Sequence, residues 1–147
     1  MAQTERMHVV GFDGTYVYGL ADAALQQRDA STLALISTLI LGNPNGVGYM
    51  PFDGTYLYAP YDGGISKVDV SSMSVTATYA SPTGAECFSL SFDGTYLYAT
   101  FYDSSIAASK TLYKVEASTM TLVSSLALTS IHQILAPSLK YAVSPIL

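Results

Sequence analysis

Carboxylate side chains recur along this chain at nearly constant spacing. Asp22 is followed by Asp62 and then by Asp103, at intervals of 40 and 41 residues. Carboxylates brought together could hold Ca²⁺, which takes about six to eight oxygen ligands. A calcium site that uses Asp62 and Asp103 is therefore one hypothesis. The favoured alternative is turn formation, because Asp62 precedes Gly63-Gly64 and both residue types are common in turns.

Residues suited to nucleophilic or acid–base catalysis are few. The chain has two histidines, His8 and His132, and one cysteine, Cys87. It contains no Gly-x-Ser-x-Gly elbow, Walker loop, His-Glu-x-x-His or Cys-x-x-Cys motif. Cys87 stands in an apolar segment, so we expect a buried and inert thiol. A nucleophilic Cys87 paired with His132 would lack a third, orienting group, and the sequence favours a protein that is not an enzyme.

Composition narrows the classes of partner. Six Lys and Arg against eleven Asp and Glu give a net charge of −5, so no basic face for nucleic acid is expected. Half of the 147 residues are hydrophobic, yet no apolar run approaches the roughly 20 residues of a membrane-spanning helix. The polar residues 1–6 predict no secretion signal. One cysteine excludes an internal disulfide, and both a cytoplasmic and a virion or cell-surface location fit.

Two motifs repeat in register. Residues 11–18, 51–58 and 91–98 share the pattern Phe-Asp-Gly-Thr-Tyr-x-Tyr at intervals of 40. Residues 29–33 and 69–73 keep that interval, whereas the third copy, 116–120, is displaced by 47. The chain therefore consists of repeats of about 40 residues, the third with a seven-residue insertion near 104–111.

Each repeat is expected to form four short strands. Aromatic and β-branched runs alternate with Gly, Asp, Pro and Ser, and Asp-Gly favours a tight hairpin. Both faces of such runs are apolar, which is typical of strands covered on both sides. The expected strands are 7–12, 15–20, 25–29 and 33–41; 46–52, 55–61, 65–69 and 73–80; 86–92, 95–102, 111–116 and 119–128. A four-stranded antiparallel unit of this length predicts an all-β fold of β-propeller blades.

The repeated motif also resembles a known family. Phe-Asp-Gly-Thr-Tyr-Leu-Tyr-Ala, followed by residues 65–69 and a new strand, is similar to the YVTN-type, lactonase-like β-propeller repeat, and more distantly to WD repeats. Phe stands where Pro commonly precedes Asp-Gly. The resemblance covers roughly residues 7–143 and implies the fold. It also leaves open a hydrolase, although the active-site residues of lactonase-like enzymes cannot be assigned to positions in this chain.

The repeats predict about three and a half blades. We expect an N-terminal extension (1–6), blade 1 (7–42), blade 2 (43–81), blade 3 (82–129) and a half blade of two strands (130–147). Single-ring propellers have typically four to eight blades, so an open arc would leave apolar faces and strand edges bare. We therefore expect a homo-oligomer, with a homodimer that completes the ring as the first choice. Docking on a different protein, a truncated propeller and a distorted four-bladed ring are the alternatives.

The resemblance also implies a ligand face. In propellers, the loops after the second strand and before the first strand share one face near the central channel. The candidate site residues on that face are Asp22, Asp62, Asp103, Tyr61, Tyr102, Glu86 and His132. Two functions follow. One is a non-enzymatic scaffold that self-assembles and binds protein partners, with no cofactor apart from the Ca²⁺ considered above. The other is a small lactonase-like hydrolase or metal-dependent enzyme with its site in the channel of the assembled ring.

The remaining repeated residues are expected to be structural. Asp13, Asp53 and Asp93 precede the hairpin glycines, and their carboxylates are expected to accept hydrogen bonds from turn amides. The tyrosines of the motif, at positions 16, 18, 56, 58, 96 and 98, are expected to pack between blades.

Overall fold

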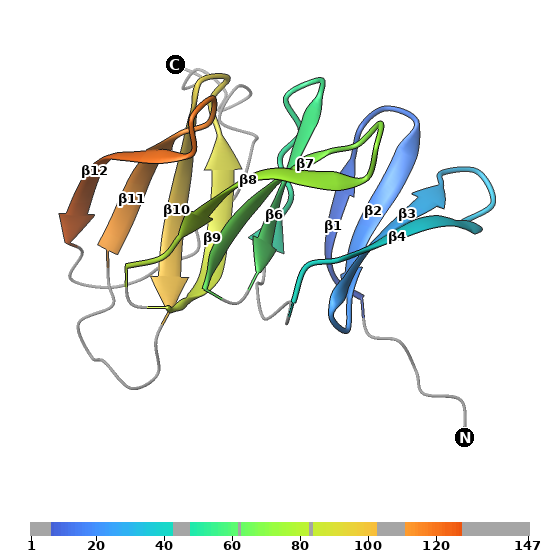
Figure 1. Ribbon diagram of the computed structural model, residues 1–147, viewed down its shortest axis with the longest axis horizontal. Coiled ribbons are helices and arrows are strands. Elements are labelled where there is room, and N and C mark those ends of the chain that lie inside the picture. Colours follow the sequence, from blue (N-terminus) through green and yellow to red (C-terminus); the bar gives the residue numbers. More distant parts are fainter. Residues whose placement is uncertain (1–6, 43–47, 62, 83, 103–110, 128–147) are drawn as a thin grey trace, which may run out of the picture.

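The computed structural model describes residues 7–42, 48–61, 63–82, 84–102 and 111–127. Within these ranges the chain forms only strands and turns, which confirms the all-β prediction (Figure 1). The strands are β1 (Met7–Phe12), β2 (Tyr16–Ala21), β3 (Ala24–Asp29), β4 (Leu35–Ile40), β5 (Gly48–Tyr49), β6 (Tyr56–Tyr61), β7 (Gly64–Asp69), β8 (Ser74–Ala80), β9 (Glu86–Phe92), β10 (Tyr96–Tyr102), β11 (Thr111–Glu116) and β12 (Thr121–Ala127).

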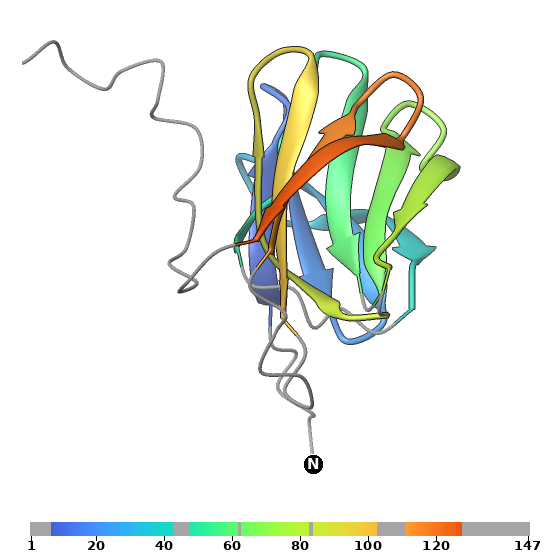
Figure 2. The same cartoon turned by 90° about the vertical axis from the view of Figure 1, so that its left-hand side faces the viewer.

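The strands form three sheets that lie side by side, as two views at right angles show (Figures 1 and 2). The strand orders are β4-β3-β2-β1-β5, β6-β7-β8 and β12-β11-β10-β9. Apart from β5, which pairs with β1 in parallel, the paired strands are antiparallel neighbours in the chain. We call β1–β4 blade 1, β5–β8 blade 2 and β9–β12 blade 3. The prediction of propeller blades is confirmed for the described part of the chain. Blades 1 and 3 contain the four predicted antiparallel strands, whereas the sheet of blade 2 has three, because β5 pairs with β1.

Blade 2 differs from the prediction at its first strand. The sequence predicts a continuous strand over 46–52. Of its described residues, 48–52, Gly48–Tyr49 pair with β1 and Phe52 forms an isolated bridge with Leu57. Pro51 explains the break, because proline has no backbone N–H to donate to a ladder. Its carbonyl oxygen still accepts a hydrogen bond from the Tyr58 amide at 2.9 Å. The predicted half blade at 130–147 lies outside the described residues.

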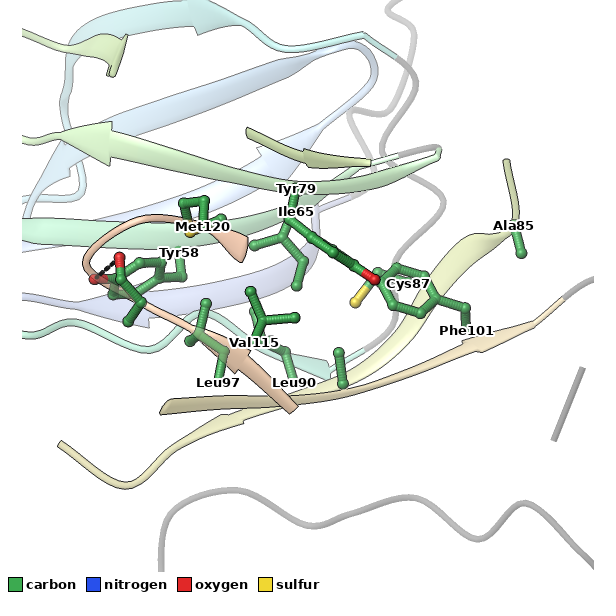
Figure 3. Close-up of a cluster of buried hydrophobic side chains, with 12 residues drawn as sticks. Tyr58, Ile65, Tyr79, Ala85, Cys87, Leu90, Leu97, Phe101, Val115 and Met120 are labelled. Carbon is green, nitrogen blue, oxygen red and sulfur yellow. Dashed lines mark hydrogen bonds between the residues drawn. The ribbon is translucent and has the colours of Figure 1, made fainter. Parts of the chain in front are cut away.

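The core consists of two apolar layers between neighbouring blades. In the first layer, Tyr18, Leu20 and Leu25 of blade 1 are buried with Met50, Leu57 and Val68 of blade 2. In the second, Tyr58, Ile65 and Tyr79 of blade 2 are buried with Leu90, Leu97 and Val115 of blade 3 (Figure 3). Strands of the middle blade are therefore covered on both faces, which explains why they are apolar on both.

Two kinds of position in or beside the turns restrict the backbone. In the turn between the third and fourth strands, Leu33, Met73 and Met120 have φ values of 59°, 48° and 55°. This left-handed conformation costs an L-residue about 1–2 kcal/mol. At the start of β7, a Cβ added to Gly64 would overlap the carbonyl oxygen of Tyr79 in β8. The neighbouring strand therefore requires glycine there.

Candidate functional site

The Asp-Gly hairpins are the best-defined polar elements of the fold. Oδ1 of Asp53 accepts hydrogen bonds from the amides of Thr55 (2.9 Å) and Tyr56 (2.7 Å), as the sequence predicts. Oδ2 accepts a further hydrogen bond, at 2.6 Å, from the hydroxyl of Tyr58. The other two hairpins contain the same arrangement, built on Asp13 and Asp93. Sequence reasoning missed the tyrosine partner, although its constant spacing of five residues was a usable signal.

These contacts favour the ionised form of Asp13 and the neutral form of Tyr58. Burial would raise the pKa of Asp13, but hydrogen bonds from Tyr16, Tyr18 and Thr15 outweigh it, and the pKa lies below 3.8. Burial raises the pKa of the Tyr58 hydroxyl, and the hydrogen bond to Asp53 raises it further. The site is therefore suited to holding the hairpins rigid.

Lys67 links blade 2 to blade 3. Only 7% of this residue is exposed. Its Nζ atom donates hydrogen bonds to the carbonyl oxygens of Ala117 (2.9 Å) and Ser118 (3.2 Å) in the turn between β11 and β12. The ammonium group also lies 4.3 Å from the centre of the Tyr56 ring, which is a favourable cation–π geometry. A buried charge is tolerated here because both kinds of partner compensate for its lost hydration.

The position of Lys67 is occupied by lysine in blade 3 and by glutamine in blade 1. In blade 3, Lys114 occupies it, with Nζ 3.9 Å from the centre of the Tyr96 ring. In blade 1, Gln27 occupies it and donates through Nε2 to the Tyr18 hydroxyl at 3.0 Å. Cation–π contacts thus recur within blades, while the Lys67 contact with carbonyl oxygens joins two blades.

An open groove of about 950 Å³ lies between the hairpins of blades 2 and 3. Asp53, Tyr56, Lys67 and Asp93 are among the residues that line it. The groove therefore presents a polar and aromatic surface. Both of its carboxylates accept hydrogen bonds from amides of their own turns. It lies at the opposite ends of the strands from the ligand face that the sequence predicts.

The predicted ligand face is only partly described. Asp22 is exposed in the turn between β2 and β3, with a φ of 51°. Half-buried Tyr61 ends β6, and Glu86 begins β9 opposite Tyr102 in the antiparallel ladder. The structure therefore brings Glu86 and Tyr102 together as backbone partners. The described residues do not include Asp62, Asp103 or His132. The structure therefore does not test the predicted calcium site.

Other chemistry is limited in the part of the chain that the structure covers. Cys87 is fully buried, and burial raises the pKa of its thiol to about 12, so the thiolate is scarce at neutral pH. No three His, Cys, Asp or Glu side chains of the described ranges are grouped so that they could hold a metal ion. Nor do these ranges include a helix long and apolar enough to cross a membrane.

The three side-by-side antiparallel blades define the chain as β-propeller in fold. Solved structures with a similar fold include Kuenenia stuttgartiensis hydrazine synthase (16% identity, TM-score 0.70, 88% of this chain and 38% of that one). U3-55K (13%, 0.69, 87% and 41%) and the WD40 repeats of RRP9 (13%, 0.69, 87% and 40%) are similar too. This chain thus spans about two fifths of their length, and at these identities the likeness shows the fold alone. No protein-family model and no curated protein matches the sequence.

Proposed function

We propose that the chain is a non-enzymatic β-propeller module, a scaffold that self-assembles and binds protein partners. One observation carries the proposal: positions that are buried where a blade precedes are exposed on blade 1. Leu90 and Met120 of blade 3 are 1% and 4% exposed, whereas the equivalent Val10 and Leu33 of blade 1 are 49% and 58% exposed. Contiguous exposed apolar surface of this kind marks interaction sites in soluble proteins.

Ring closure by a homodimer is the arrangement we favour. Two copies would supply six full blades. This number of blades falls within the usual range of about four to eight for single rings. The fold likeness to U3-55K and to the WD40 repeats of RRP9 supports a propeller, and the Phe-Asp-Gly-Thr-Tyr-Leu-Tyr repeat supports the YVTN type.

Protein partners are part of the same proposal. The groove between the hairpins of blades 2 and 3 offers a concave surface with aromatic and carboxylate groups. A similar fold also occurs in the structure titled as the Mitotic Checkpoint Complex (15% identity, TM-score 0.64, 83% of this chain and 37% of that one).

Light scattering across a concentration series tests self-assembly. We expect dimers at micromolar concentration, and a clean monomer there would contradict the proposal. The control variant is Val123→Thr, which removes an exposed apolar side chain from β12. Threonine is chosen because blade 2 has Thr76 at the equivalent position. This variant is expected to assemble normally.

Two further measurements on the assembled protein test the alternatives. Hydrolysis of a lactone substrate above the background rate would show an enzyme and overturn the non-enzymatic assignment. Metal analysis by mass spectrometry tests the calcium site predicted at Asp62 and Asp103. Stoichiometric Ca²⁺ that is lost in Asp62→Asn would establish the site, and protein that stays metal-free in millimolar Ca²⁺ would refute it.

A further inference from the structure

The interface between blades 2 and 3 is a complete example of how two blades of this chain join. Lys67 of blade 2 donates to the carbonyl oxygens of Ala117 and Ser118 in the outer turn of blade 3. Next to it, the rings of Tyr58 and Phe92 pack with their centres 5.6 Å apart. The interface thus combines a buried hydrogen-bonded ammonium group with an aromatic pair.

Blade 3 repeats the contacting half of this interface on its far face. The equivalents of Tyr58 and Lys67 are Tyr98 and Lys114, which are directly paired between β10 and β11. The outer part of this face is uncovered, because Leu126 is 60% exposed where its equivalent in blade 2, Tyr79, is 7% exposed. Within the described ranges, Lys114 meets no carbonyl oxygen at hydrogen-bond distance.

Blade 1 repeats the receiving half. Phe12, the equivalent of Phe92, is 50% exposed on the face that has no preceding blade. The outer turn of blade 1 has the sequence Ala30-Ser31-Thr32, which is identical to Ala117-Ser118-Thr119 in the turn that receives Lys67. The outer turn of blade 2 has the sequence Val70-Ser71-Ser72 instead. The preceding blade, blade 1, has Gln27 at the position of the lysine. Lysine and the Ala-Ser-Thr turn therefore occur together.

We propose that blade 3 of one copy docks onto blade 1 of a second copy, with Lys114 donating to the carbonyl oxygens of Ala30 and Ser31. Tyr98 packs on Phe12 of the second copy, as Tyr58 packs on Phe92. This inference rests on the proposed self-assembly and names the two surfaces that meet. A second copy is the occupant because, among the described residues, the exposed blade face that carries an Ala-Ser-Thr turn is that of blade 1.

Arg28 is a charged residue on the receiving face that the other two blades lack. It stands where blades 2 and 3 have the buried valines Val68 and Val115. Its guanidinium group donates to Oε1 of Gln26 (2.6 Å) and to the carbonyl oxygen of Leu33 (3.0 Å), which holds it on its own blade. Since the charge must be partly desolvated on docking, Arg28 makes this interface weaker than those inside the chain.

Three substitutions test the interface through the dimer dissociation constant. Lys114→Gln installs the residue of blade 1 at that position and should raise the constant at least about tenfold, since hydrogen bonds from a charged donor are lost. Phe12→Ser should also raise it. Arg28→Val, which restores the valine of the other blades, should lower it, and misfolding cannot produce that result. Val123→Thr is the matched control, and circular dichroism checks the fold of each variant.

Chemical cross-linking tests which surfaces meet. Ser31→Cys places a thiol beside the predicted position of the partner's Lys114, and a short amine-to-thiol linker should give a covalent dimer joined between residues 31 and 114. The matched position Ser71→Cys lies in the outer turn of blade 2 and should give none. Adding Lys114→Gln to Ser31→Cys should abolish the link.

The outcomes separate this inference from the proposed function. A monomeric wild type overturns both. A dimer whose dissociation constant is unaffected by Lys114→Gln, Phe12→Ser and Arg28→Val overturns only the interface. A dimer that forms no link between residues 31 and 114 also overturns only the interface. In that case another surface of the protein, or residues 130–147, covers blade 3.

Discussion

Replacing the three hairpin tyrosines with phenylalanine gives an internally controlled test of the aspartate–tyrosine hydrogen bonds. Tyr18 and Tyr58 are buried and donate to Asp13 and Asp53 at 2.6 Å, whereas half-buried Tyr98 donates to Asp93 at 2.9 Å. Hydrogen bonds to charged groups contribute about 1.5–3 kcal/mol, and we expect losses in this range for Tyr18→Phe and Tyr58→Phe. Tyr98→Phe should cost less than about 1 kcal/mol, because water can replace its hydroxyl at an exposed carboxylate.

The assay is urea unfolding followed by far-ultraviolet circular dichroism. The protein concentration is kept below the dimer dissociation constant, because association would cover Tyr98 and add to apparent stability. The chain has no tryptophan, so circular dichroism avoids a signal that the substitutions themselves would change. Equal slopes against urea are required before free energies are compared. If Tyr98→Phe costs as much as Tyr58→Phe, burial does not decide the strength of these bonds and the reasoning is refuted.

Three further predictions concern the turns and their charges. Gly64→Ala should lower the free energy of unfolding by about 2 kcal/mol or more, since overpacking against backbone cannot relax easily, and a stability near wild type would contradict the overlap with Tyr79. In the monomer, Leu33→Gly should raise the free energy of unfolding by about 0.5–1 kcal/mol, because it removes left-handed strain at an exposed residue. Met120→Gly should lower it, because that side chain is buried. Urea unfolding of both variants below the dimer dissociation constant checks the opposite signs. Hydrogen bonds from Ser31 and Thr32 lower the pKa of Asp29 from 3.8 to about 2. The folded pKa is depressed, so this contribution to stability is present above about pH 4 and is lost as the pH falls towards 2. Asp29→Asn should flatten that part of an acid titration of stability, and an unchanged profile would count against it.

Much of the fold could be predicted from the sequence because its repeats are local. Each strand and turn is encoded within a few residues, so β1, β9 and β11 begin and end where the pattern predicts. The exception is the first strand of blade 2, where Pro51 cannot donate to the hairpin partner β6 and Gly48–Tyr49 pair instead with β1 of a different blade. Pairing partners of that kind are not encoded locally.

The candidate site was harder to predict, because it depends on which blade faces which. Lys67 is an ordinary lysine in the sequence, and only the packing of blade 3 against blade 2 brings its ammonium group to the carbonyl oxygens of Ala117 and Ser118. The groove beside it likewise forms between two hairpins that are 40 residues apart. Sequence reasoning directed attention to the other ends of the strands, where Asp22 and Tyr61 lie.

By itself, the sequence determined the repeat, its four strands, the Asp-Gly hairpins and the apolar character of both blade faces. These properties follow from residue types within one unit of about 40 residues. Only the tertiary structure decided which copies of a repeated residue are buried and which are exposed. Val10 and Leu90 are equivalent in the repeat, yet one is 49% and the other 1% exposed. The difference arises because burial depends on a neighbouring blade, which no single repeat contains.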